Sequence, residues 1–292
     1  MPATRTVKFE SRSLSYERTC VQVDICERNS QLEPRVMWSV NGKPFYGTDA
    51  AKCFDELKYS TARTSVYANG EASFDGAPAR LASPEHLAPV FLMWPRRRFN
   101  VDACAEGAAP CSAELPMLDG SALPFFHAVR KQAGTPEELV FYDAPVTDSW
   151  EWSTGAVRIY PSETFEVEYV LGFGSAASVA VYSAEDLYNI FEARTFIFES
   201  EYEKARQAGL LAGVDETCGL LLKDGDAALN ATKYRVAEEP AFHKILDLLG
   251  DLTFVKPALP KIHIEILNGG HFHHHKIMEK VLPYAIRCRI CP

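Results

Sequence analysis

Short apolar runs separated by turn residues dominate the first third of the chain, and they predict β-strands. Four such runs, TVKFES, CVQVDICE, RVMWSV and TSVYANG, are rich in β-branched and aromatic residues. The pattern changes in SPEHLAPVFLMW, which predicts a helix with Ser83 as its N-cap and with Pro89 shortening or bending it. A strand, FNVDACAEG, follows, and an amphipathic helix is expected from Ser121 to Gln132, before Gly134.

The same order returns in the second half of the chain. A polar, proline-bearing segment from Gly134 to Ser149 is interpreted as a linker, and the strands AVRIYPS and TFEVEYVLGF follow it. Next come a helix in SAEDLYNIFEARTFI, an insert at about residues 200–231, the helix AFHKILDLLGD, the strand KIHIEIL and a last helix from Phe272 to Leu282. Strands followed by helices, twice, predict an α+β protein with two tandem domains, residues 1–135 and 136–292.

Charge and cysteine content exclude some classes of protein. The 292 residues carry a net charge of −9 and no long basic block, so nucleic acid is not an expected partner. The first residues lack the apolar core of a signal peptide, and no apolar stretch is long enough to cross a bilayer, which predicts a cytoplasmic protein. The eight cysteines should then be mostly reduced; Cys288 and Cys291 form half of a zinc site at best, or belong to a frayed tail.

Three polar residues share one face of the predicted helix AFHKILDLLGD. His243, Asp247 and Asp251 follow one another at intervals of four residues, beside an apolar set that a core would bury. His243 and Asp247 could give one nitrogen and one oxygen to the same ion, and such ligands with an open position suit catalytic Zn²⁺, with Fe²⁺ also compatible. A surface histidine beside a solvated carboxylate has the same spacing, so this pattern alone leaves both interpretations open.

Two further groups of polar residues are candidates for chemistry. The segment NGGHFHHHK places four histidines behind a glycine pair, which is compatible with a metal store. Because residues at a helix start point in different directions, we expect only one of the four to be functional. Glu85 and His86 are adjacent at another expected helix start, and a glutamate beside a metal-binding histidine can activate water as a general base.

Five segments, in this order, resemble the zinc-dependent UDP-3-O-acyl-N-acetylglucosamine deacetylases (LpxC type) of lipid A biosynthesis. SPEHL resembles the Glu-His helix start of that family, and ELPMLDGSALPF resembles its Pro-x-Met-Asp-Gly-Ser-Ala-x-Pro-Phe signature. EARTFIF, FHKILDLLGDL and GGHFHHHK resemble its Ala-Arg-Thr-Phe, His-Lys-x-x-Asp-x-x-Gly-Asp and Gly-His segments. The resemblance extends from about Thr61 to Leu282 and so covers most of the chain.

The resemblance implies a fold and a mechanism. Two domains would each pack a β-sheet on two helices, with the helices of both domains facing each other in a β-α-α-β sandwich and zinc at the interface. The implied zinc ligands are His86, His243 and Asp247, with Glu85 as general base, His271 as general acid, Asp251 orienting His271, Thr195 supporting the oxyanion and Lys244 contacting substrate. The implied substrate is a nucleotide sugar, UDP-3-O-acyl-N-acetylglucosamine, from which a monomeric enzyme would remove the acetyl group.

Other polar residues in these segments receive no catalytic role. Asp119 and Ser121 belong to a structural turn signature of the family, and His127 and His263 are expected to be ordinary surface or core histidines. The three histidines at 273–275 replace polar residues of the family loop, so they too are left out of the chemistry.

Three segments depart from the family pattern where substrate would be recognised. Glu10–Thr19 lacks the glycines and the histidine of the family's first hairpin, Ile197 replaces a glycine, and Ala212–Gly219 differs from the family's acyl-passage segment. A zinc deacetylase of another N-acetyl sugar or of a small amide therefore stays an alternative. A non-catalytic relative is the second alternative, although retention of the acid-base residues beside the ligands argues against it.

Overall fold

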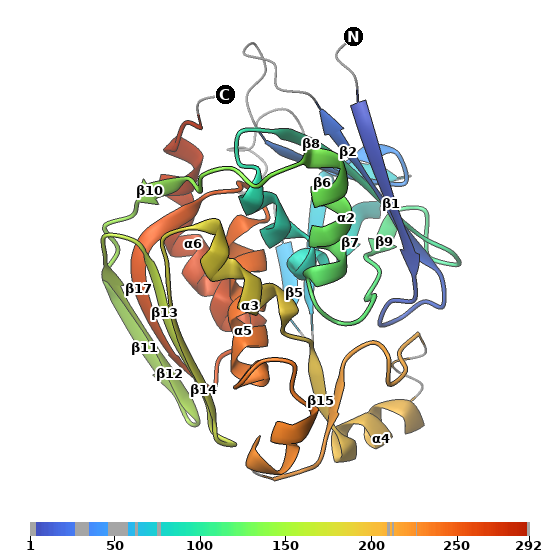
Figure 1. The fold of residues 1–292 in the computed structure, drawn as a ribbon. Coiled ribbons are helices and arrows are strands. Elements are labelled where there is room, and N and C mark those ends of the chain that lie inside the picture. Colours follow the sequence, from blue (N-terminus) through green and yellow to red (C-terminus); the bar gives the residue numbers. More distant parts are fainter. Residues whose placement is uncertain are drawn as a thin grey trace.

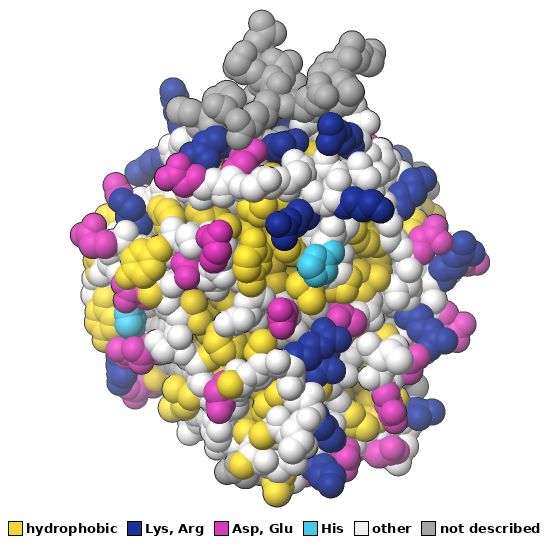
Figure 2. Space-filling view, in the orientation of Figure 1, with side chains coloured by type: hydrophobic (Ala, Val, Ile, Leu, Met, Phe, Trp, Pro, Cys, Tyr) yellow, Lys and Arg dark blue, Asp and Glu magenta, His cyan; other side chains and the backbone are white. Residues whose placement is uncertain are grey.

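The computed structural model shows an α+β fold with helices between β-sheets (Figure 1), as the sequence predicted. The residues that it describes are 4–26, 35–45, 58–61, 64–74, 77–208, 211, 213–225 and 227–290. Within these ranges no helix is long and apolar enough to span a membrane. Charged side chains of both signs are interspersed over the face shown in Figure 2, and apolar side chains lie between them.

Two sheets form from the N-terminal part of the chain. The first has the order β1 (Thr4–Ser11), β2 (Thr19–Cys26), β8 (Arg98–Ala105), β3 (Val36–Val40) and β4 (Lys43–Pro44). The second has the order β5 (Lys58–Thr61), β6 (Ser65–Phe74), β7 (Ala77–Ala82) and β9 (Ser112–Glu114). In β2, Val21, Val23 and Ile25 alternate with less buried residues and are themselves buried, so one face of the first sheet covers the core.

A larger sheet forms from the C-terminal part of the chain. Its order is β11 (Asp148–Trp152), β12 (Gly155–Pro161), β17 (Leu259–Leu267), β13 (Phe165–Leu171) and β14 (Ser175–Val181), and β10 (Phe141–Asp143) also pairs with β17. The central strand β17 runs antiparallel to β12 and parallel to β13. Its Ile262, Ile264 and Ile266 are buried on the side that faces the core.

Helix α5 (Glu239–Thr253) lies in the middle of the helical layer. It packs against α6 (His271–Arg287), α3 (Tyr188–Glu192) and the 3₁₀ helices η1 (Pro84–His86) and η2 (Ala88–Met93). Helix α2 (Leu123–Ala133) covers β1 and touches α3. Helices from both parts of the chain therefore meet between the sheets (Figure 1), while a domain boundary at residue 135 stays a prediction.

Two helices differ from the predictions. The helix expected in SPEHLAPVFLMW is the pair of 3₁₀ helices η1 and η2; Ser83 has a φ of 59° and makes no side-chain cap bond, and Pro89, which lacks an N–H, sits in the first turn of η2. The helix expected from Ser183 is η3 (Ala184–Leu187) followed by α3, which ends at Glu192. The chain then forms β15 (Phe196–Phe198), which pairs with β16 (Leu220–Leu222).

The insert at 200–231 and the cysteines complete the fold. The insert region contains α4 (Glu199–Gln207), β16 and η4 (Ala227–Lys233). Cys20 and Cys104 face each other in the register of β2 and β8 and form a disulfide, so the prediction of reduced cysteines was wrong for this pair. Cys26, Cys111, Cys218 and Cys288 are free, whereas Cys291, and with it the C-terminal pair, lies outside the described residues.

Candidate active site

Helix α5 carries two of the three candidate metal ligands. The apolar residues that anchor it in the core include Ile245, Leu246, Leu248 and Leu249. On the other face, Nε2 of His243 lies 3.2 Å from Oδ1 of Asp247. The Nδ1 atom of His243 lies 3.1 Å from the carbonyl oxygen of Ala193, so Nδ1–H donates to this carbonyl and Nε2 is left to face Asp247.

The third candidate ligand, His86, comes from η1. Its Nε2 lies 3.5 Å from the same Oδ1 of Asp247, and the ligand atoms of His86, His243 and Asp247 (the ligand triad) lie within 4.8 Å of one another. Burial lowers the pKa of His243; burial would raise the pKa of Asp247, but His243 and Lys244 hold it well below its usual range. Neutral imidazole and ionised carboxylate are the forms that bind a divalent metal, so the ligand triad fits one.

A glycine of α5 allows η1 to come this close. A Cβ atom built on Gly250 would lie 2.1 Å from the carbonyl oxygen of Glu85 and 2.5 Å from its Cα. The backbones of α5 and η1 are therefore in direct contact at this point. This contact sets the position of Glu85 and His86 relative to Asp247, one turn earlier on α5.

One carboxylate oxygen of Glu85 accepts hydrogen bonds from the protein, and the other has no hydrogen-bond partner among the described residues. The hydroxyl of Thr64 and, at 3.3 Å, the backbone N–H of Ser65 donate to Oε1. Oε2 is buried and has no hydrogen-bond partner among the described residues, and Glu85 lines the cavity beside the ligand triad. Burial raises the pKa of this carboxyl, against the opposing effect of His271 and His86. A buried acceptor with a free oxygen at a cavity can serve as a general base.

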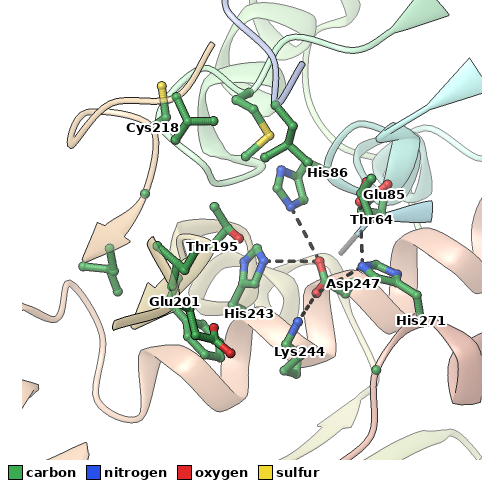
Figure 3. A pocket seen from close by; sticks show the side chains of 18 of the residues that line it. Thr64, Glu85, His86, Thr195, Glu201, Cys218, His243, Lys244, Asp247 and His271 are labelled. Atoms are coloured by element: carbon green, nitrogen blue, oxygen red, sulfur yellow. Dashed lines mark hydrogen bonds and ion pairs between the residues drawn. The ribbon is translucent and has the colours of Figure 1, made fainter. Parts of the chain in front are cut away.

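His271 lies beside the ligand triad, next to Asp247 (Figure 3). Its Nδ1 is 2.8 Å from Oδ2 of Asp251, and its Nε2 is 3.8 Å from Oε1 of Glu85 and 3.7 Å from Oδ2 of Asp247. Burial alone would lower the pKa of His271, but Asp251 and Asp247 raise it to about 9. At neutral pH His271 therefore carries a proton on Nε2 and can act as an acid.

Thr195 is placed by two glycines that lie far apart in the sequence. Its backbone N–H donates to the carbonyl of Gly120 at 2.7 Å. A Cβ atom at either Gly120 or Gly219 would lie 2.9 Å from the Cγ2 methyl of Thr195. The methyl group therefore packs on the glycines, and Figure 3 shows the hydroxyl turned to the side of His243.

Lys244 lies at the cavity but is already paired. Its Nζ is 2.9 Å from Oδ2 of Asp247 and 5.5 Å from the ring centroid of Phe196. The structure thus brings together all eight residues that the sequence singled out. Their catalytic, metal-binding and substrate-binding roles stay predictions.

The cavity beside these residues has a volume of about 530 Å³. Its apolar lining comprises Leu14, Met117, Phe196, Ile197, Leu211, Val214, Leu220 and Leu221 among others. Two of the segments that depart from the family pattern meet at this wall: Arg12 forms a 2.6 Å ion pair with Asp215, and a Cβ atom at Gly213 would lie 2.2 Å from the carbonyl oxygen of Ser13. These segments therefore shape the space that a substrate would enter.

Several residues around Asp251 were missed or misread in the sequence. His274 and His275 are fully buried and contact Asp251, so the expectation that the clustered histidines point in different directions was wrong for them. Ser65 and Tyr67 of β6 also donate to Asp251, the latter at 3.0 Å. His127 and His263 lie outside the cavity, as expected.

Comparison with known proteins identifies the same family that the sequence motifs resemble. The family model described as LpxC, UDP-3-O-acyl N-acetylglycosamine deacetylase, matches residues 98–283. This range contains all but two of the eight site residues; Glu85 and His86 precede it and join the site through the contact of η1 with α5.

Curated relatives named UDP-3-O-acyl-N-acetylglucosamine deacetylase are similar to the chain. The protein of Phenylobacterium zucineum is 30% identical over 241 residues, which cover 79% of this chain and 78% of the relative. That of Synechocystis sp. is 32% identical over 178 residues, 58% of this chain and 63% of the relative. That of Anaeromyxobacter dehalogenans is 30% identical over 219 residues, 70% and 66% respectively. The chain therefore belongs to the UDP-3-O-acyl N-acetylglycosamine deacetylase family.

Proposed function

We propose that this protein hydrolyses the acetamide group of UDP-3-O-acyl-N-acetylglucosamine, with Zn²⁺ as its metal, in lipid A biosynthesis. The names of the curated relatives support the substrate. The observation that carries the proposal is the convergence on one cavity of the ligand triad, of Glu85, whose Oε2 has no hydrogen-bond partner among the described residues, and of His271. A metal site, a base and an acid in one water-accessible space are the parts that amide hydrolysis needs.

Each group has a defined task in this reaction. A divalent ion on the ligand triad would supply a Lewis acid that polarises the amide carbonyl. Glu85 takes a proton from the attacking water through Oε2, and the hydroxyl of Thr195 stabilises the carbonyl oxygen as negative charge builds on it. His271 gives its Nε2 proton to the sugar nitrogen as the C–N bond breaks, which releases acetate and the free amine. Asp251 keeps His271 charged and oriented.

A second candidate substrate is an N-acetyl sugar without a nucleotide. Among the described residues that line the cavity, Lys244 is the single lysine or arginine, and it is paired with Asp247 at 2.9 Å. The lining also includes the acids Glu201, Asp215 and Glu216. A diphosphate gains most from clustered cationic donors, so this charge pattern favours a less anionic substrate.

Acetate release from UDP-3-O-acyl-N-acetylglucosamine by the purified, zinc-loaded protein tests the proposal. Release should stop on chelation and return with Zn²⁺. Glu85→Ala and His271→Ala should each lower kcat by about 10²- to 10⁴-fold, because each removes an acid-base group, while the metal stays bound. Near-normal turnover in either variant would contradict the assigned roles. Release from a nucleotide-free N-acetyl sugar alone would favour the second substrate.

A further inference from the structure

Three histidines on the first turns of α6 point at one carboxylate. His271, His274 and His275 have the spacing i, i+3 and i+4, which puts them on one face of a helix, and all three are buried. Nδ1 of His271 and Nδ1 of His274 lie 2.8 and 3.2 Å from Oδ2 of Asp251. Nε2 of His275 lies 3.1 Å from Oδ1 of Asp251. The mechanism above uses only His271, so the other two contacts need a reason.

The donor and acceptor atoms of His274 can be assigned. Its Nε2 lies 3.0 Å from the hydroxyl of Tyr169, and both side chains are buried. Burial lowers the pKa of His274 to about 4 and raises that of Tyr169 well above its usual value, so the imidazole is neutral and the phenol keeps its proton. The Tyr169 O–H therefore donates to Nε2, and Nδ1–H of His274 donates to Asp251. The chain of donors runs from Tyr169 through His274 to Asp251.

His275 reaches the other oxygen of the carboxylate through its other nitrogen. Its Nε2 lies 2.9 Å from the hydroxyl of Ser65 as well as 3.1 Å from Oδ1 of Asp251. Ser65 and Tyr67 also donate to Oδ1. His275 thus acts on Oδ1 through Nε2, whereas His274 acts on Oδ2 through Nδ1.

The carboxylate of Asp251 is saturated by these donors. A carboxylate offers about four lone-pair sites, and five side chains of the described residues contact this one: Ser65, Tyr67, His271, His274 and His275. A second metal ion would have to displace several of them. The cluster therefore works as a hydrogen-bonded anion with both oxygens held in fixed directions.

We infer that His274 and His275 are positioning residues, which hold the carboxylate of Asp251 in the plane that keeps Oδ2 on Nδ1 of His271. The inference rests on the proposed function, because it assigns these residues to the delivery of the His271 proton. Without His274, Oδ2 keeps only the contact with His271 among the described residues, so one of the two contacts that fix the direction of this oxygen is lost. Without His275, Oδ1 of Asp251 likewise loses one of its contacts.

The two histidines use different nitrogens, and this predicts opposite effects of the same substitutions. The amide nitrogen of asparagine is bonded to Cγ, as Nδ1 of histidine is, and that of glutamine is bonded to Cδ, as Nε2 is. His274→Asn should therefore keep the contact with Asp251 and most of kcat, whereas His274→Gln should lower kcat by about 10- to 100-fold, the usual effect of losing such an orienting partner. At position 275 the order reverses, with His275→Gln the mild variant and His275→Asn the severe one.

The experiment measures kcat, KM and bound metal for the four variants, with His263→Gln on the outer sheet face as a control that changes none of them. KM and metal content should stay constant, because neither histidine is among the described residues that line the cavity. The ¹⁵N signal of His271 Nδ1 is recorded in parallel and should change only in the two severe variants. If asparagine and glutamine act alike at each position, in kcat and in this signal, the inference is wrong. A wild-type protein without acetate release would refute the proposed function instead, and the ¹⁵N signal would still decide the positioning role.

Discussion

Gly250→Ala should lower kcat strongly although it changes no catalytic side chain. The added methyl group points at the backbone of Glu85, where its Cβ would lie 2.1 Å from the carbonyl oxygen and 2.5 Å from Cα. Cβ atoms essentially never come closer than 3.0 Å to another heavy atom, so the gap must open by at least 3.0 − 2.1 = 0.9 Å. Both partners are backbone, so no flexible side chain can absorb the shift. Helix η1 must move away from α5, and Glu85 and His86 must move with it.

The size of this shift sets the expected effect. A displacement of about 1 Å in a catalytic group can lower turnover by about 100-fold. An alanine in a helix interior should stabilise the protein by about 1 kcal/mol relative to glycine, whereas overpacking a close contact costs about 1–3 kcal/mol. The net change in the free energy of unfolding is therefore small, and the loss of kcat should be large by comparison.

The assay compares kcat, metal content and melting temperature of Gly250→Ala with those of Gly107→Ala. Gly107 has a φ of 80° with no atom within 4 Å of a built Cβ, so alanine there is strained but displaces nothing. The control should lower the melting temperature slightly and keep kcat. If Gly250→Ala instead melts higher than wild type with full kcat, as helix propensity alone would predict, the backbone contact does not position the site and the reasoning is refuted.

Three further predictions concern the metal, the acid and the disulfide. Asp247→Ala should lose the metal, and full occupancy by elemental analysis would contradict its place in the ligand triad. Activity should fall as pH rises through about 9, because His271 loses its proton there. Asp251→Asn removes a negative charge that raises the pKa of His271, so the basic limb of the pH–rate profile should move to lower pH. An unchanged basic limb would contradict the role assigned to His271. Cys104→Ser opens a link between residues 84 apart and should lower the free energy of unfolding by up to about 4 kcal/mol; a reducing agent should then shift the melting temperature of wild type but not of the variant.

Residues on one helix were accessible from the sequence, and contacts between elements were not. His243, Asp247 and Asp251 share a helix, so their spacing alone aligned them. His86 is different. Its place beside a glutamate made it a candidate, but its distance to Asp247 depends on how η1 packs on α5, and only the family resemblance grouped it with His243 and Asp247. The disulfide could not be predicted for the same reason, because Cys20 and Cys104 lie opposite each other only in the register that β2 and β8 adopt.

The histidine cluster shows a signal that was present and not used. The spacing of His271, His274 and His275 is that of one helix face, and a helix was expected to begin at Phe272. The sequence prediction took these side chains to diverge at a helix start, and it therefore missed that all three point at one carboxylate. Ser65 and Tyr67 alternate on β6 and so share one side of a strand. Nothing in the sequence, however, pairs that side with Asp251 on a distant helix.

The ligand triad draws on two distant stretches of the chain, His86 on η1 and the other two on α5, and this affects how much protein a cell keeps. An ion held by the ligand triad would meet all three residues only after η1 has docked on α5, so its binding free energy would add to the stability of the folded state. A fall in stability of about 1–2 kcal/mol can change the abundance of a protein several-fold through proteolysis. Metal supply should therefore affect the abundance of this protein as well as its catalytic rate, because a metal-starved cell would degrade more of the metal-free chain.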